Sequence, residues 1–194
     1  MRVLPCGDRA LIIECASLDE ARGWHAALDG QVEAVLGART VLVHGDPAAL
    51  RSLIARTRPA ELADTEHDAV EIPVVYDGED LDEVARLTGL TTREVVDAHT
   101  GRPWTAAFSG FAPGFVYLAG GDPRLVVPRR ATPRTRVPAG AVGLAGELSG
   151  VYPRPSPGGW QLIGRTYVPL WDLDNDPPAL LRPGARVRFV EAGG

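Results

Sequence analysis

The chain has 194 residues, of which 45% are hydrophobic and 23% charged, and its formal net charge is −5. This length fits one large or two small domains, and this hydrophobic content is sufficient for a buried core. No apolar run approaches the roughly 20 residues that a membrane-spanning helix needs. All twenty basic residues are arginine, which excludes a P-loop lysine and a Schiff-base lysine in this chain.

The charge is divided unequally along the sequence. Residues 1–100 hold nine arginines and nineteen acidic residues, whereas residues 101–194 hold eleven arginines and six acidic residues. This asymmetry predicts two modules, the second suited to an anionic ligand or an acidic partner. The acidic total and the lack of a basic-aromatic recognition motif argue against a nucleic-acid partner. Two cysteines make neither a disulfide framework nor a zinc site, and no export signal is recognisable, so we expect a cytoplasmic protein.

Expected strands alternate with expected helices in the first part of the chain, which predicts a small α/β domain. The strands are residues 10–14, 40–44 and 69–76, and Pro73 marks the third as an edge strand or a bulge. We place the end of this domain at residue 78. Apart from His99, the histidines have no partner motif and are interpreted as structural or surface residues: His25, His44 and His67.

Helix starts are recognisable by their caps. Ser17 and Glu20 fit a capping box, and Asp46-Pro47 fits an N-cap followed by proline at the first helical position. Two short helices follow between residues 79 and 100, and Thr91 and Glu94 give the second of them a capping box.

The amino-acid composition changes after residue 100. Residues 101–170 hold ten of the seventeen prolines and twelve of the twenty-two glycines, and the apolar runs become short. Short strands separated by Gly/Pro turns predict a β-barrel or a β-sandwich. The expected strands are 105–108, 115–118, 125–127, 141–145, 161–163, 167–171 and 187–190.

Two motifs and an arginine run organise this second half. The first motif is Phe108-Ser109-Gly110-Phe111-Ala112-Pro113-Gly114-Phe115-Val116-Tyr117-Leu118, and the second contains Ser156-Pro157-Gly158-Gly159-Trp160. No acidic residue lies between Asp122 and Glu147, so the arginines between the motifs are expected to be unpaired. Glycine allows close backbone approach to a ligand, and arginine binds planar anions in a bidentate manner. The arginines of the run are Arg124, Arg129, Arg130, Arg134 and Arg136.

Each candidate has a functional and a structural interpretation. The loop at Gly110–Gly114 either presents N–H groups to an oxyanion or phosphate, or forms a tight turn packed by aromatic residues. Trp160 is either a pocket wall or a core anchor. Arg130 and Arg134 either bind a carboxylate or phosphate, or lie on a solvated face or at an interface with acidic residues of a partner. His99, at the end of a capped helix, is either a general base or a structural residue at that helix terminus.

Several mechanisms are not supported by the sequence. Ser109, Ser149 and Ser156 lack a nucleophile-elbow motif, so covalent serine catalysis is not expected. No His/Cys/Asp cluster has metal-ligand spacing, so any magnesium is expected to arrive with a nucleotide.

The chain resembles the allophanate hydrolase subunit 1 family, which includes the PxpB component of bacterial 5-oxoprolinase and the kinase inhibitor KipI. The resemblance is strongest from Val70 to Trp171 and departs from the family where Leu148 replaces a common glutamine and where Gly184-Ala185 replaces a usual Gly-Asp. The motifs that carry it are Gly110-Phe111-Ala112-Pro113-Gly114-Phe115-Val116-Tyr117-Leu118, Pro128-Arg129-Arg130-Ala131-Thr132-Pro133-Arg134, Val137-Pro138-Ala139-Gly140 and Pro157-Gly158-Gly159-Trp160.

The resemblance implies an α+β protein, with a small α/β domain over residues 1–78 and a cyclophilin-like β-barrel domain over residues 79–194. It implies a subunit of an ATP-dependent amidohydrolase that opens 5-oxo-L-proline to L-glutamate, with ATP and magnesium at a site that a partner shares. The implied partners are a subunit 2 of KipA or PxpC type, in a heterodimer or heterotetramer, and a third subunit of PxpA type. The alternatives are a KipI-like inhibitor of a sensor histidine kinase and a subunit that acts on allophanate or another ureide.

We therefore predict two sets of site residues. The catalytic set is His99, Arg130 and Arg134. The substrate-binding set is Gly110, Phe111, Pro113, Gly114, Phe115, Tyr117, Pro157, Gly158, Gly159 and Trp160.

Overall fold

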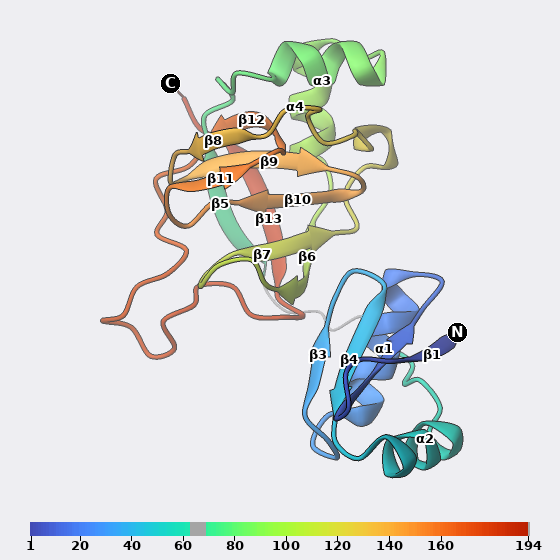
Figure 1. Cartoon of the computed structure of the whole chain (residues 1–194). Helices are drawn as coiled ribbons and strands as arrows, with labels where there is room; N and C mark the ends of the chain where they lie inside the picture. Colours follow the sequence, from blue (N-terminus) through green and yellow to red (C-terminus); the bar gives the residue numbers. More distant parts are fainter. Residues whose placement is uncertain (63–68, 194) are drawn as a thin grey trace. The chain divides into compact units, whose positions relative to one another are not determined.

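The computed structural model describes residues 1–62 and 69–193, which form two compact units within Met1–Glu66 and 67–194 (Figure 1). The domain boundary expected after residue 78 differs from this division, because strand β5 (Val70–Val74) pairs in parallel with β13 (Arg186–Glu191) of the second unit. His67, which we interpreted as structural or surface, lies outside the described residues. Within the described ranges, no helix is both long enough and apolar enough to cross a bilayer.

The first unit is an antiparallel sheet with two helices. The sheet order is β1-β2-β4-β3, and alternate side chains of β2 and β4 are fully buried, so one face of the sheet forms the core of this unit. The helices begin as the sequence predicts, since Ser17 accepts from the amide of Glu20, and Asp46 accepts from the amide of Ala49. The elements are β1 (Arg2–Pro5), β2 (Ala10–Glu14), α1 (Leu18–Leu28), β3 (Ala34–Leu36), β4 (Thr40–His44) and α2 (Pro47–Arg56).

The second unit is a nearly closed seven-stranded barrel with the order β12-β9-β10-β7-β6-β13-β5. The two ends of this order meet at one bridge, where Val75 and Arg165 exchange backbone hydrogen bonds of 2.9 Å. Pro73 therefore lies in a terminal strand of the sheet, as its missing N–H predicts. The remaining strands of the barrel are β6 (Trp104–Ser109), β7 (Val116–Ala119), β9 (Ala141–Ala145), β10 (Leu148–Val151) and β12 (Gln161–Arg165).

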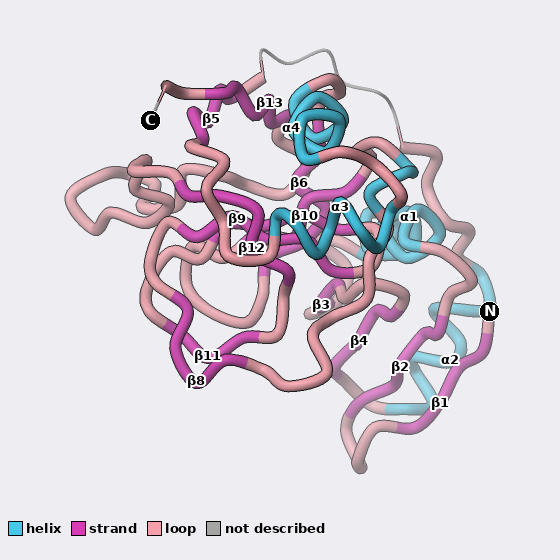
Figure 2. Tube along the Cα trace, turned by 90° about the horizontal axis from the view of Figure 1, so that it is seen from above, coloured by secondary structure: helices cyan, strands magenta, loops and turns pink. Residues whose placement is uncertain are grey.

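Two helices pack together on one side of the barrel, as Figures 1 and 2 show: α3 (Leu81–Thr88) and α4 (Thr92–Thr100). The capping box predicted for Thr91 and Glu94 is present in full, with each residue bonding the backbone of the other. The largest buried cluster joins these helices to the inward-facing side chains of the barrel, so α3 and α4 belong to the barrel unit.

A two-stranded ribbon of β8 (Arg134–Val137) and β11 (Ser156–Gly158) lies outside the seven-stranded order (Figure 2). A separate buried cluster lies in this region and contains Phe115, Tyr152 and Trp160. The barrel unit therefore has an inner core and a second, aromatic cluster associated with the ribbon.

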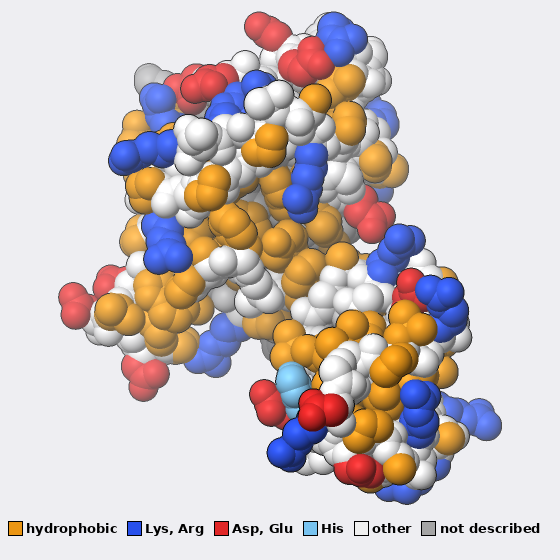
Figure 3. All heavy atoms as spheres, viewed as in Figure 1, with side chains coloured by type: hydrophobic (Ala, Val, Ile, Leu, Met, Phe, Trp, Pro, Cys, Tyr) orange, Lys and Arg blue, Asp and Glu red, His pale blue; other side chains and the backbone are white. Residues whose placement is uncertain are grey.

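Two expected strands did not form. Leu125 ends a short 3₁₀ helix (Pro123–Leu125), and residues 125–127 otherwise form only a bridge from Val127 to Gly146. Residues 167–171 have no strand apart from a bridge at Trp171. The burial of this run does alternate, since Tyr167 is 79% exposed and Leu170 is 3% exposed, but among the described residues the run pairs with no neighbouring strand beyond the bridge from Trp171 to Ala179, and Pro169 has no N–H to donate. The segment between β12 and β13, at the lower left of Figure 1, carries apolar side chains with acidic ones beside them (Figure 3).

Candidate functional site

The loop between β6 and β7 lines an open pocket of about 450 Å³. Phe111 adopts a left-handed backbone conformation, with φ of 67°, which is uncommon for a bulky residue and is a feature of strained functional loops. Phe111 is 57% exposed. Gly114 also has a positive φ, and a Cβ there would lie 2.7 Å from the Cβ of Trp171, so the loop packs closely against the segment after β12. Four predicted residues line the pocket, namely Gly110, Phe111, Pro113 and Gly114, together with Trp171 and Leu181.

Residues 110–114 carry four backbone N–H groups, and two of them donate within the loop. Gly110 donates to the carbonyl of Phe115, Ala112 donates to that of Gly110, and Phe115 donates to that of Ala112. Pro113 has no N–H to offer. The internal hydrogen bonds indicate a rigid turn, the N–H groups of Phe111 and Gly114 make no hydrogen bond within it, and the pocket presents mainly apolar surface.

The aromatic cluster connects the two sequence motifs. Trp160 contacts Phe115 and Tyr117, with ring centroids 5.6 and 5.7 Å apart, and Phe111 contacts Phe115 at 5.3 Å. Trp160 is 4% exposed, so it is placed as a core anchor under the loop. Tyr152 adds edge-to-face contacts to Phe111 and Phe115. The contacts with Phe115 and Tyr152 hold the ring of Phe111 against the buried aromatic cluster.

The second motif also contributes close packing. A Cβ at Gly158 would lie 2.2 Å from the hydroxyl oxygen of Tyr152, so only glycine fits there. Pro157 is exposed, and the carbonyl of Gly159 accepts a 2.8 Å hydrogen bond from the amide of Arg130. The motif thus joins the aromatic cluster to the arginine segment.

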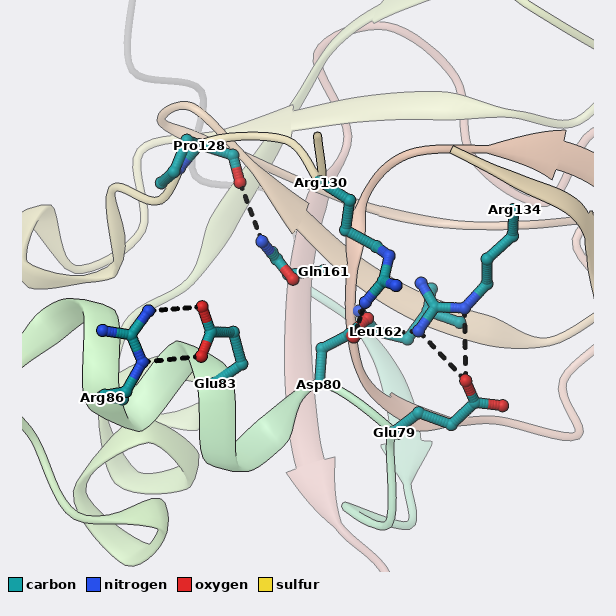
Figure 4. Close-up of polar contacts among 9 residues, drawn as sticks. All are labelled: Glu79, Asp80, Glu83, Arg86, Pro128, Arg130, Arg134, Gln161 and Leu162. Carbon is teal, nitrogen blue, oxygen red and sulfur yellow. Dashed lines mark hydrogen bonds and ion pairs between the residues drawn. The ribbon is translucent and has the colours of Figure 1, made fainter. Parts of the chain in front are cut away.

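Arg130 and Arg134 converge on one buried carboxylate, that of Asp80 (Figure 4). Asp80 is 3% exposed and precedes α3, and its Oδ1 accepts from the Nη1 of Arg130 and, at 2.9 Å, from the Nη2 of Arg134. Its Oδ2 accepts from the amide of Leu162 at 2.7 Å. Arg134 also donates from Nη2 to Glu79 at 3.0 Å. Asp80 therefore links α3 to β8 and β12.

The charge of Asp80 is favoured in spite of its burial. Burial opposes the charged form, but the hydrogen bonds from Arg134 and the Leu162 amide, with both guanidinium charges, outweigh it and lower the pKa of Asp80. A buried carboxylate held in this way keeps both arginine side chains in a fixed position.

The expectation of an unpaired arginine run is wrong for three of its members. Arg124 pairs with Asp122, and Arg130 and Arg134 pair with Asp80. The expectation considered only acids near the run, whereas Asp80 lies 50 residues before Arg130. Within the described part of the chain, Arg129 and Arg136 have no ion-pair partner.

His99 lies apart from the arginines, inside the barrel. It is fully buried, its Nδ1 is hydrogen-bonded to the hydroxyl of Tyr76 at 2.7 Å, and its Nε2 to that of Ser149 at 2.9 Å. Its ring stacks on Phe189 with centroids 4.3 Å apart. Burial lowers the pKa of His99 to about 3. This placement favours the structural interpretation, and a role of His99 in catalysis stays a prediction.

Asp80, Tyr152 and Trp171 were not predicted as site residues. Asp80 precedes an apolar helix pattern, which marks it as a helix start but carries no signal of burial or of distant partners. Trp171 was interpreted as part of a strand, and only the tertiary contact with Gly114 brings it to the pocket. Clusters of three or more metal-ligating side chains do not occur among the residues that the structure describes.

Comparison with solved structures defines the class of protein. The protein TTHA0988 superposes with a TM-score of 0.77 at 38% sequence identity, over 96% of this chain and 41% of that chain. The nearly closed sheet order and this match define a two-unit protein with a cyclophilin-like barrel.

The chain belongs to the family described as carboxyltransferase domain, subdomain C and D, which matches residues 1–181. It is 39% identical to the B-type subunit of 5-oxoprolinase from Haemophilus influenzae, over 100% of this chain and 99% of that protein. It is 50% identical to the B-type subunit of 5-oxoprolinase from Bacillus subtilis over 124 residues, which are 62% of this chain and 52% of that protein. The match thus spans about half of the Bacillus protein and about two fifths of TTHA0988.

Proposed function

We propose that this chain is the B-type subunit of a heteromeric ATP-dependent 5-oxoprolinase. The proposed reaction opens 5-oxo-L-proline to L-glutamate and converts ATP and water to ADP and phosphate. The observation that carries the proposal is the identity of 39% to the Haemophilus 5-oxoprolinase subunit over the full length of this chain. The partners we propose are a subunit 2 of PxpC or KipA type and a third subunit of PxpA type.

The chemistry of the barrel unit supports this substrate class. 5-Oxo-L-proline has a small ring and one carboxylate, so its site needs apolar walls and a cation. The pocket beside Phe111 supplies apolar walls. The guanidinium groups of Arg130 and Arg134, which do not line that pocket, match the planar geometry of a carboxylate.

ATP would supply a phosphoryl group that activates the lactam oxygen. The Gly110–Gly114 loop offers few N–H groups to phosphates, because two of its four donate within the loop and the pocket that it lines is mainly apolar. We therefore assign the binding of ATP and magnesium to the assembled complex and place no step of that binding on residues of this chain. What this chain contributes is the fixed arginine pair and the apolar loop.

The proposal is tested by reconstitution. The chain is co-purified with its subunit 2 and mixed with the third subunit, and L-glutamate is measured after addition of ATP and 5-oxo-L-proline. We expect glutamate from the full mixture and none when this chain alone is omitted. A complex that forms but makes no glutamate contradicts the proposal, and parallel assays with allophanate and with a histidine kinase then test the two alternative functions.

A further inference from the structure

One edge of the Arg134 guanidinium is covered by an exposed acidic side chain. Glu79 Oε2 accepts from the Nε of Arg134 at 3.2 Å and from its Nη2 at 3.0 Å. The Arg134 side chain is only 14% exposed, whereas the Glu79 side chain is 77% exposed. Figure 4 shows Glu79 reaching the guanidinium of Arg134 next to Asp80. The edge that could take a carboxylate is therefore closed by a group that solvent surrounds.

The two carboxylates on Arg134 differ in how firmly they are held. Asp80 is buried, is shared by Arg130 and Arg134, and is fixed by the Leu162 amide. Glu79 makes no further side-chain hydrogen bond or ion pair among the described residues, and exposed ion pairs contribute little because water and salt compete with them. An incoming anion would therefore replace Glu79 and leave Asp80 in place.

The charges of this cluster match one monovalent anion. Two arginines face two carboxylates as the structure stands, so the cluster is balanced. When Glu79 leaves Arg134, the two guanidinium groups face Asp80 alone and one positive charge is unbalanced. The Nε–H and Nη2–H of Arg134 form a planar fork, which suits the two oxygens of a carboxylate.

We propose that the Glu79 carboxylate occupies the position on Arg134 that the carboxylate of the substrate takes when it binds. The substrate carboxylate then displaces Glu79 from the Nε and Nη2 of Arg134. The identity of the ligand as a small lactam carboxylate rests on the proposed function, whereas the displacement of Glu79 rests on the contacts of Arg134. Asp80 acts as a positioning residue in this exchange, because its Oδ1 accepts from the same Nη2 of Arg134 and also from Arg130.

Removal of Glu79 tests the proposal through a gain of affinity. In Glu79→Ala the competitor is absent, and because exposed ion pairs are weak we expect 5-oxo-L-proline to bind about two- to five-fold more tightly than to the native chain. The matched control is Glu147→Ala, which removes an exposed carboxylate of the same unit that has no ion-pair partner among the described residues. Binding to the full chain is measured by calorimetry at fixed ionic strength.

Two further ligands test whether a gain of affinity in Glu79→Ala depends on the carboxylate of 5-oxo-L-proline. The carboxamide of 5-oxo-L-proline lacks the anion, so we expect its affinity to be the same in the native chain and in Glu79→Ala. Inorganic phosphate tests whether the cluster takes phosphate instead. A gain for phosphate without a gain for 5-oxo-L-proline contradicts the assignment of a carboxylate.

Three results overturn the inference: equal affinity of the native chain and Glu79→Ala, an equal gain in Glu147→Ala, or no binding of 5-oxo-L-proline by any of these chains. Glutamate formation by the reconstituted complex is measured separately. Turnover that depends on this chain, combined with any of the three results, leaves the proposed function intact and refutes only the role of Glu79.

Discussion

Substitution of Asp80 by asparagine is the sharpest test of how the arginine pair is held. The variant keeps the size of the side chain and one oxygen for the Leu162 amide, but it removes the charge that Arg130 and Arg134 share. Arg130 is 35% exposed and can turn to water, whereas Arg134 is 14% exposed and stays in a largely desolvated position.

The expected cost is large for a single substitution. Loss of one partner of a buried ion pair costs about 3–5 kcal/mol, and we expect about 3 kcal/mol here because the Leu162 contact is retained. For a chain of this size that corresponds to a fall in Tm of about 6–12 °C. The pKa of Asp80 is lowered in the folded state, so its stabilisation is present above its usual pKa and is lost as the pH falls through the folded value.

The free energy of unfolding is measured in urea at pH 7 and at pH 3. The matched control is Asp82→Asn, which changes an exposed acid in the first turn of the same helix. We expect the native chain to lose stability between these pH values more steeply than Asp80→Asn. A loss below about 1 kcal/mol at pH 7, or a loss no greater than that of the control, would refute the argument that Asp80 organises this site.

Three other predictions address the histidine, the loop and the ribbon. The pKa of His99 is lowered to about 3, so between pH 6.5 and 3 the unfolded chain binds a proton that the native chain does not. As the pH falls through that range, the free energy of unfolding of the native chain should decrease by up to about 1.4 kcal/mol per pH unit. His99→Gln should lack this part of the pH dependence in urea unfolding. Phe111→Gly relieves the strain of the left-handed backbone and removes an exposed ring, so the Tm should change little. The KM of the reconstituted complex for 5-oxo-L-proline should rise, and an unchanged KM argues against contact between Phe111 and the substrate. Gly158→Ala places a Cβ 2.2 Å from the Tyr152 hydroxyl and should cost about 1–3 kcal/mol in urea unfolding, whereas Gly159→Ala, with no atom closer than 3.7 Å, should be nearly neutral; equal costs would contradict this packing.

The parts of the fold that local rules govern were predictable from sequence. The caps at Ser17, Asp46 and Thr91 all form as their spacing indicates, since a cap depends on residues within one turn. The change from an α/β texture to short strands after residue 100 correctly indicated the barrel. The strand at β5 was predicted, but its place in the barrel unit was not, because its pairing with β13 joins residues more than a hundred positions apart.

The sequence predicted many residues of the candidate site, but not which of them contact one another. The sequence identified Phe111, Trp160 and the arginines through unusual residue types in close spacing. It did not identify Asp80 as their partner, because burial and long-range pairing leave no local pattern. For His99 the residue type was no guide: a single histidine in the last turn of a helix fits a base and a core residue equally well, and only its contacts with Tyr76 and Ser149 distinguish them.

The central claim is that this chain is a required subunit of an ATP-coupled lactam hydrolase. The most direct test measures ADP and L-glutamate in the same reaction of the reconstituted complex, with and without 5-oxo-L-proline. We expect the two products to rise together in equal amounts, and only when this chain and the lactam are both present. ADP release that is indifferent to the lactam, or glutamate formation that continues without this chain, would contradict the account.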